Sequence, residues 1–118
     1  MVETISLFAL LIVGHSLADF PQQGDYLAKL KNRFAPLPGQ GWYHGLLNHA
    51  AIHGGFVGAI VGLMTGSQTT GLVLGLTEFV AHCVIDDTKC RGRLSYDQDQ
   101  MLHVMCKVVW VAAIGVFQ

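Results

Sequence analysis

Four apolar segments, at roughly residues 3–20, 42–65, 69–88 and 97–117, leave this chain few ways to fold. Glycine, proline and polar residues separate them, and each is long enough for a helix of about five to six turns. Only 13% of the residues are charged, whereas soluble domains have about 25%. The sequence therefore predicts an all-α fold: a four-helix transmembrane bundle forming a single membrane domain over residues 1–118.

The placement of positive charge favours a membrane over a soluble bundle. Hydropathy alone does not decide, because the uninterrupted apolar runs reach only about 10–14 residues, a length often found in soluble cores. Nearly all the Lys and Arg residues fall in the first and third connections, at residues 29–33 and 89–93. Both connections lie at the same end of a four-helix hairpin, as the positive-inside bias requires of cytoplasmic loops. We therefore expect a multi-pass protein with both termini outside.

Aromatic and small residues support the same arrangement. Four aromatic residues flank the basic end, as an interfacial belt does. They are Tyr26, Trp42, Tyr43 and Tyr96. In the first connection, apolar residues from Tyr26 to Phe34 alternate with basic ones at helical spacing, which predicts a short interfacial helix between helices 1 and 2. In the second helix, small residues recur every four positions from Ala50 to Gly66, a pattern typical of close helix packing in lipid.

Polar residues recur in pairs on all four segments. The members of each pair are four positions apart and so share one helix face. The pairs are His15 and Asp19, His49 and His53, His82 and Asp86, and Asp99 and His103. Counted from the uncharged end of each helix, one His of every pair lies about 20–22 Å deep, and the other member lies one turn nearer the basic end. We therefore expect two stacked layers: four His in one, and three Asp with His49 in the other.

These eight residues predict a metal site near the cytoplasmic face. Ionisable groups inside a membrane cost about 2.5–3.5 kcal/mol each, and they are functional by default. Imidazole and carboxylate ligands together suit a divalent transition metal such as Zn, Mn, Fe or Ni, and eight ligands suffice for two ions. A hydrogen-bond network in which each Asp fixes a His explains the same pairs without metal and stays open as an alternative.

Two further charges lie deeper in the bundle. Glu78 shares a helix face with His82 and Asp86, and Lys107 lies at a matching depth on the next helix. A buried ion pair between Glu78 and Lys107 is one interpretation. The other is a functional role for Glu78, either as a metal ligand or as a catalytic residue, in which case Glu78 or Asp86 acts as the general base.

The polar motifs resemble a known family. H-x-x-x-D at His15, H-x-x-x-D-x-x-K at His82 and D-Q-x-x-H at Asp99, together with the second-helix His pair, are similar to the domain-of-unknown-function family 3307. Its members are small multi-helix membrane proteins of bacteria and their phages. The resemblance covers nearly the whole chain, and it implies a location in the bacterial inner membrane, or in the host inner membrane for a phage-encoded member. It implies no reaction.

The leading functional hypothesis is a metal-dependent hydrolase at the cytoplasmic membrane face, where a metal activates water. The expected partners are membrane lipids and an anionic small molecule or lipid substrate, drawn by the basic connections. A metal or proton transporter is weaker, because the far half of each helix is nearly free of polar residues. A haem-binding bundle or a non-catalytic structural or phage accessory protein would also fit the pattern. The net charge of −1 gives no reason to expect nucleic acid.

Overall fold

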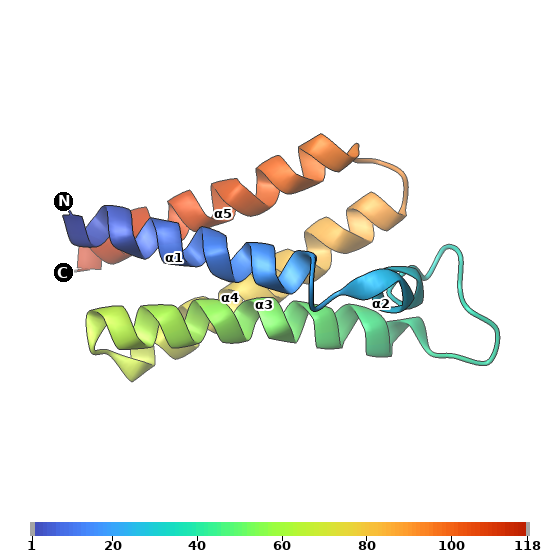
Figure 1. Cartoon of the computed structure of the whole chain (residues 1–118), viewed down its shortest axis with the longest axis horizontal. Helices are drawn as coiled ribbons and strands as arrows, with labels where there is room; N and C mark the ends of the chain where they lie inside the picture. Colours follow the sequence, from blue (N-terminus) through green and yellow to red (C-terminus); the bar gives the residue numbers. More distant parts are fainter. Residues whose placement is uncertain (1, 118) are drawn as a thin grey trace.

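The computed structural model describes residues 2–117 and is built of helices (Figure 1). They are α1 (Val2–Asp19), α2 (Gly24–Leu30), α3 (Trp42–Thr65), α4 (Gln68–Cys90) and α5 (Tyr96–Phe117). The four long helices agree with the predicted segments to within two residues at each end. The short α2 lies where the interfacial helix was expected, so the predicted fold class is confirmed.

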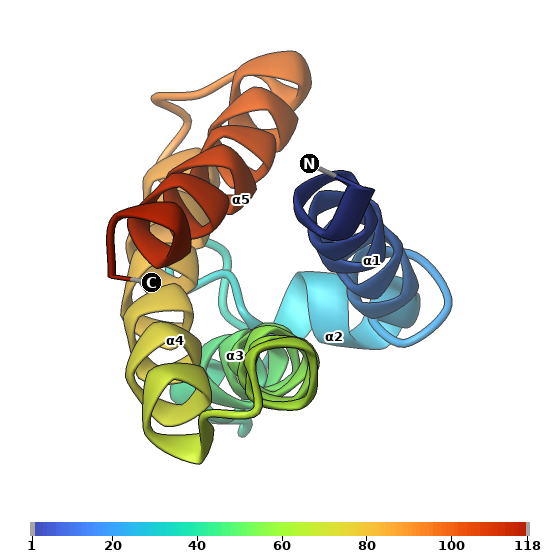
Figure 2. The same ribbon diagram turned by 90° about the vertical axis from the view of Figure 1, so that its left-hand side faces the viewer.

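The four long helices form a bundle in which α1 contacts α3 and α5, and α4 contacts the same two helices. The end view shows them around a common axis, with α2 crossing behind (Figure 2). The start of α1, the end of α5 and the α3–α4 turn lie at one end, here called the terminal end (Figure 1). The connections that carry the Lys and Arg clusters lie at the opposite end, here called the basic end.

Glycines on both sides bring α3 and α4 into close contact. A Cβ on Gly71 would lie 2.5 Å from the Gly58 carbonyl oxygen, and one on Gly75 would lie 2.7 Å from the Gly54 carbonyl oxygen. The small-residue stripe predicted on α3 therefore meets a matching pair on α4, which was not predicted. A tight turn joins the two helices, because Gly66 adopts φ 69° and ends α3.

The helix α2 turns sharply away from α1 and lies against α3. The angle between α1 and α2 is 85°, so α2 runs across the basic end of the bundle. A Cβ on Gly45 would lie 2.6 Å from the backbone nitrogen of Lys31. The absence of a side chain at Gly45 thus allows the end of α2 to rest directly on α3.

The exterior of the bundle is apolar, whereas its interior holds about as many polar as hydrophobic side chains. Among the described residues, buried side chains include ten polar or charged residues as well as nine hydrophobic ones. Large hydrophobic side chains face outward, for example Leu63, Leu72 and Val84, with 79%, 64% and 61% of their surface exposed. Helices α3, α4 and α5 are long and apolar enough to span a membrane, and the bent pair α1–α2 adds a fourth candidate. These features are consistent with a multi-pass membrane protein.

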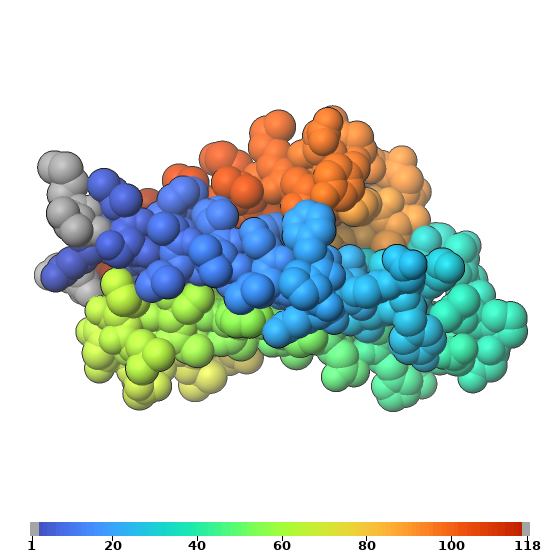
Figure 3. Space-filling model, viewed as in Figure 1, coloured from blue at the N-terminus to red at the C-terminus, as the bar shows by residue number. Residues whose placement is uncertain are grey.

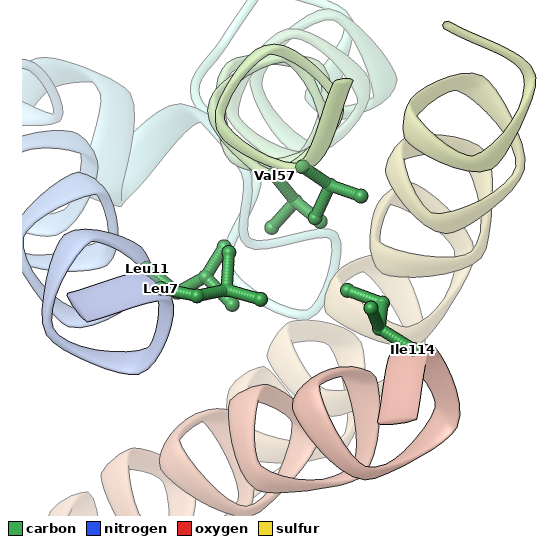
Figure 4. Packing of buried hydrophobic residues seen from close by; sticks show 5 residues of the cluster. Leu7, Leu11, Val57 and Ile114 are labelled. Atoms are coloured by element: carbon green, nitrogen blue, oxygen red, sulfur yellow. The ribbon is translucent and has the colours of Figure 1, made fainter. Parts of the chain in front are cut away.

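The main cluster of buried hydrophobic side chains lies toward the terminal end. Leu7 and Leu11 of α1 point toward Val57 of α3 and Ile114 of α5 (Figure 4). The space-filling view shows α1 lying along the molecule between α3 and α5 (Figure 3). The apolar cluster therefore closes the bundle on the terminal side, and the polar residues occupy the part nearer the basic end.

Candidate metal centre

Four buried histidines, one from each long helix, form a closed ring across the bundle. His53 of α3 stacks on His82 of α4 with ring centroids 3.6 Å apart, and His82 lies 4.2 Å from His103 of α5. His15 of α1 completes the ring, with its centroid 5.2 Å from that of His53 and 5.3 Å from that of His103. This is the histidine layer that the helix positions predicted.

The second layer lies one turn nearer the basic end. His49 Nε2 is 3.3 Å from Asp19 Oδ1 and 3.6 Å from Asp86 Oδ2. Asp19 Oδ1 also lies 3.0 Å from His53 Nε2, and Asp86 Oδ1 lies 3.2 Å from His103 Nε2. The carboxylates of the second layer therefore contact the imidazoles of the first, and all eight predicted residues gather in one region.

Three overlapping groups offer ligand atoms that lie within 4.8 Å of one another. They are Asp19, His49, His53 and His82; Asp86, Asp99 and His103; and Glu78, His82 and His103. The first group is the largest, with one carboxylate and three imidazoles. His15 belongs to none of the three; its Nε2 lies 3.3 Å from Gln100 Oε1 and 3.5 Å from Asp19.

Several buried ring nitrogens in this region have no hydrogen-bond partner within the part of the chain that the structure describes. For His49 and His82, this is true of both ring nitrogens. His49 Nε2 is close to Asp19, but it is not aligned for a hydrogen bond. An unpaired buried polar group costs about 1–3 kcal/mol. A cation that binds the lone pair on one nitrogen of each imidazole would therefore stabilise the site.

Lysine side chains neutralise most of the buried carboxylates. Lys31 Nζ donates to Asp86 Oδ2 at 2.6 Å and also to Gln23 Oε1. Lys89 Nζ lies 3.2 Å from Asp99 Oδ2. Lys31 was predicted only as part of the basic connection, but it is 7% exposed. Lys31 follows Leu27 by four residues and therefore lies on the same, apolar face of α2. This spacing could have indicated that Lys31 is buried.

Glu78 is held by two donors from α5. Lys107 Nζ donates to Oε1 and Trp110 Nε1 to Oε2, each at 2.6 Å. Of the two interpretations drawn from the sequence, the structure therefore shows the ion pair. Trp110 was not predicted to take part, although it lies three positions after Lys107 and so on the same side of α5.

Gln100 links helices α1 and α5 across the site. Its amide nitrogen donates to Asp19 Oδ2 at 2.9 Å and to Asp99 Oδ2 at 3.2 Å. In the sequence, Gln100 stood out only as one position of the D-Q-x-x-H motif. The contact with Asp19 shows why an amide follows the aspartate there: it bridges the carboxylates of two helices.

The chain is therefore a helical bundle with helices long and apolar enough to span a membrane, and with His and Asp groups positioned to hold a metal ion. Residues 7–118 match the family described as "Protein of unknown function (DUF3307)", and the chain belongs to this family. Comparisons with the curated proteins and with the solved structures found no match.

Proposed function

We propose that this chain is an integral membrane metalloprotein whose main metal centre is the first of the three groups. The centre combines one carboxylate with three imidazoles from α1, α3 and α4. Its residues are Asp19, His49, His53 and His82. We further propose that the basic end faces the cytoplasm, so that the centre lies nearer that side.

Asp19 is the observation that carries the proposal. The three fully buried carboxylates of the described residues each contact a lysine. The pairs are Asp86 with Lys31, Asp99 with Lys89, and Glu78 with Lys107. The carboxylate of Asp19 contacts only histidines and Gln100, and it has no Lys or Arg partner within residues 2–117. A carboxylate whose side chain is only 9% exposed and that has no Lys or Arg partner is costly, and a divalent cation beside the unpaired imidazole nitrogens would neutralise it.

The donor set fits a transition metal. Imidazole suits Zn, Fe and Ni, and carboxylate also suits Mn. A metal about 2.1 Å from each ligand needs ligand atoms at most about 4.2 Å apart, whereas these atoms lie within 4.8 Å of one another. Small side-chain rotations would therefore bring the four atoms to bonding distance.

The reaction that we propose for this centre is metal-dependent hydrolysis of an anionic small molecule or lipid. A bound metal supplies Lewis acidity and activates water. Asp86 is placed to act as the general base, because its Oδ2 lies 3.6 Å from His49 Nε2 and 3.5 Å from His82 Nε2. Glu78 is suited to positioning His82, because its Oε1 lies 3.6 Å from His82 Nδ1, the ring nitrogen that faces away from Asp86.

The interior favours this function over transport and haem binding. The apolar cluster of Leu7, Leu11 and Val57 closes the terminal side of the bundle, and a transport path would need polar groups there. The four imidazole rings already pack against one another, with neighbouring centroids 3.6–5.3 Å apart. A haem bound by two of them would require these rings to separate.

Elemental analysis of detergent-purified protein tests the proposal directly. We expect about one divalent transition-metal ion per chain. Asp19→Asn and His53→Gln should each lower the metal content while leaving helix content unchanged, because the apolar surfaces are intact. His44→Gln is the matched control, since His44 lies on α3 but is exposed; its metal content should equal that of the wild type.

Thermal unfolding separates the metal centre from a structural network. Zn, Mn, Fe or Ni added at about 100 times its dissociation constant should stabilise the metal-free protein by about 2.7 kcal/mol. Wild-type protein that is folded and metal-free after gentle purification, and whose melting temperature does not respond to any of these ions, would eliminate the metal centre and leave the hydrogen-bond network.

A further inference from the structure

We propose that a second site, at the basic end between α3 and α4, binds the phosphate of an anionic lipid headgroup. The structure has a cavity of about 410 Å³ there, and none of the eight predicted metal ligands lines it. Its charged and apolar walls include Arg33, Trp42, Val84, Asp87, Arg91 and Arg93. The site does not depend on a metal being bound.

The charge of this pocket selects an anion. Three guanidinium groups line it, from the connection before α3, the end of α4 and the connection before α5, against the single carboxylate of Asp87. Arg33 and Arg91 share that carboxylate, at 2.7 Å and 3.1 Å. Arg93 has no ion pair with any carboxylate in the described part of the chain. Guanidinium groups bind phosphate in a bidentate manner, so Arg93 can contact an incoming phosphate directly.

Two of the arginines are already held in place. The guanidinium carbon of Arg33 lies 4.8 Å from the centroid of the Phe34 ring, and that of Arg91 lies 5.3 Å from the same centroid. Arg33 also lies 5.6 Å from the Trp42 ring. Stacked and ion-paired arginines have less conformational freedom to lose when a ligand binds. The pocket is therefore preorganised for its ligand.

The position of the pocket points to a lipid as the source of the phosphate. It lies at the end of the bundle that carries the interfacial aromatic residues, and Trp42 is one of its walls. The wall from α4 includes Val84, an exposed apolar residue that faces outward from the bundle. A headgroup among the arginines would place its acyl chains along this apolar surface. Basic pockets between helices on the cytoplasmic side bind anionic headgroups in this manner.

Lipid titration of the purified protein, followed by native mass spectrometry, tests the site. Phosphatidylglycerol should bind saturably, and phosphatidylcholine should bind much more weakly. The double variant Arg91→Gln/Arg93→Gln should lower the affinity for phosphatidylglycerol about tenfold or more, because it removes charge-assisted hydrogen bonds. Lys29→Gln is the matched control: Lys29 is an exposed basic residue at the same end that does not line the pocket.

The Lys29→Gln control distinguishes a specific binding site from a general electrostatic attraction between the lipid and the basic end. A loss of affinity in Lys29→Gln that equals the loss in the double variant, counted per positive charge removed, would show that the lipid senses only net charge, and would overturn the proposal. Equal binding of the two lipids would do the same. Inorganic phosphate that displaces phosphatidylglycerol completely at low concentration would assign the pocket to a free phosphate compound and overturn the lipid assignment. Metal content should be unchanged in the double variant, so this test is independent of the metal centre.

Discussion

At Glu78, the carboxylate is enclosed by a lysine and an indole from the neighbouring helix, and the three side chains form a closed unit within the bundle. Glu78 and Lys107 are each 1% exposed. A buried ion pair need not stabilise a fold relative to apolar residues, but the loss of one partner leaves the other charge buried and unpaired. The pair therefore constrains which substitutions the bundle tolerates.

We expect Glu78→Gln and Lys107→Met each to lower the free energy of unfolding by about 3–5 kcal/mol. The double variant should lose less than the sum of the two, because it leaves no unpaired charge. Denaturant unfolding of all four proteins in detergent gives the coupling energy. Additive losses would contradict the contact between Lys107 Nζ and Glu78 Oε1.

Lys31 is expected to limit how many metal ions the bundle holds. It neutralises Asp86 in the group formed with Asp99 and His103. Lys31→Met leaves two carboxylates facing only Lys89, so this group should then bind a second divalent ion. Elemental analysis would show the metal content rising from about one ion toward two per chain. An unchanged content would mean that Lys31 does not compete with metal; Lys29→Met serves as the control.

The sequence predicted the layers but not their partners. The spacing of each pair and the rise of a helix are local properties, so they placed His15, His53, His82 and His103 at one depth before any packing was known. The contact of Lys31 with Asp86 depends on how α2 is laid across α3, a tertiary feature. The hydrogen bonds of Gln100 and Trp110 could not be predicted for a similar reason, because a neutral donor cannot be recognised as part of a site until the position of its acceptor is known.

At the scale of the helices, the α3–α4 contact depends most on Gly54, Gly71 and Gly75. A Cβ at Gly58 would lie at the looser distance of 3.2 Å from the facing backbone. The carbonyl oxygens of Gly54 and Gly58 lie against Gly75 and Gly71, where any Cβ would be closer than 3.0 Å to backbone. The backbone cannot move away from an added Cβ as a flexible side chain can. The repeat on α3 was visible in the sequence, whereas its partner on α4 consists of only two glycines and becomes meaningful only when the helices are placed side by side.

Gly75→Ala should lower the free energy of unfolding by about 1–3 kcal/mol, because the added methyl group forces α3 and α4 apart. Gly55→Ala is the matched control on α3, since a Cβ there would meet nothing within 4 Å. The control should be neutral or stabilised by up to about 1 kcal/mol, the helix propensity gained by replacing glycine. Equal effects of the two substitutions in thermal unfolding would contradict the close contact.

For the whole molecule, the dimensions and the distribution of charge are consistent with a multi-pass membrane protein. Its long axis measures 47 Å, close to the roughly 40–45 Å of a bilayer with its headgroups. The basic end carries both Lys and Arg clusters, although Lys31 turns inward and leaves fewer charges at the surface. The other Lys and Arg residues of the two clusters still lie at the basic end, and within residues 2–117 Glu3 is the only charged side chain at the terminal end.

We therefore expect both termini to face away from the cytoplasm, because short connections rich in Lys and Arg are retained inside. An alkaline phosphatase fused after the last residue should be active, and green fluorescent protein at the same place should be dark. Fusions placed after Arg93, in the connection before α5, should give the opposite result and serve as the control. A fluorescent C-terminal fusion would reverse the topology, and it would put both the metal centre and the arginine pocket on the outer side of the membrane.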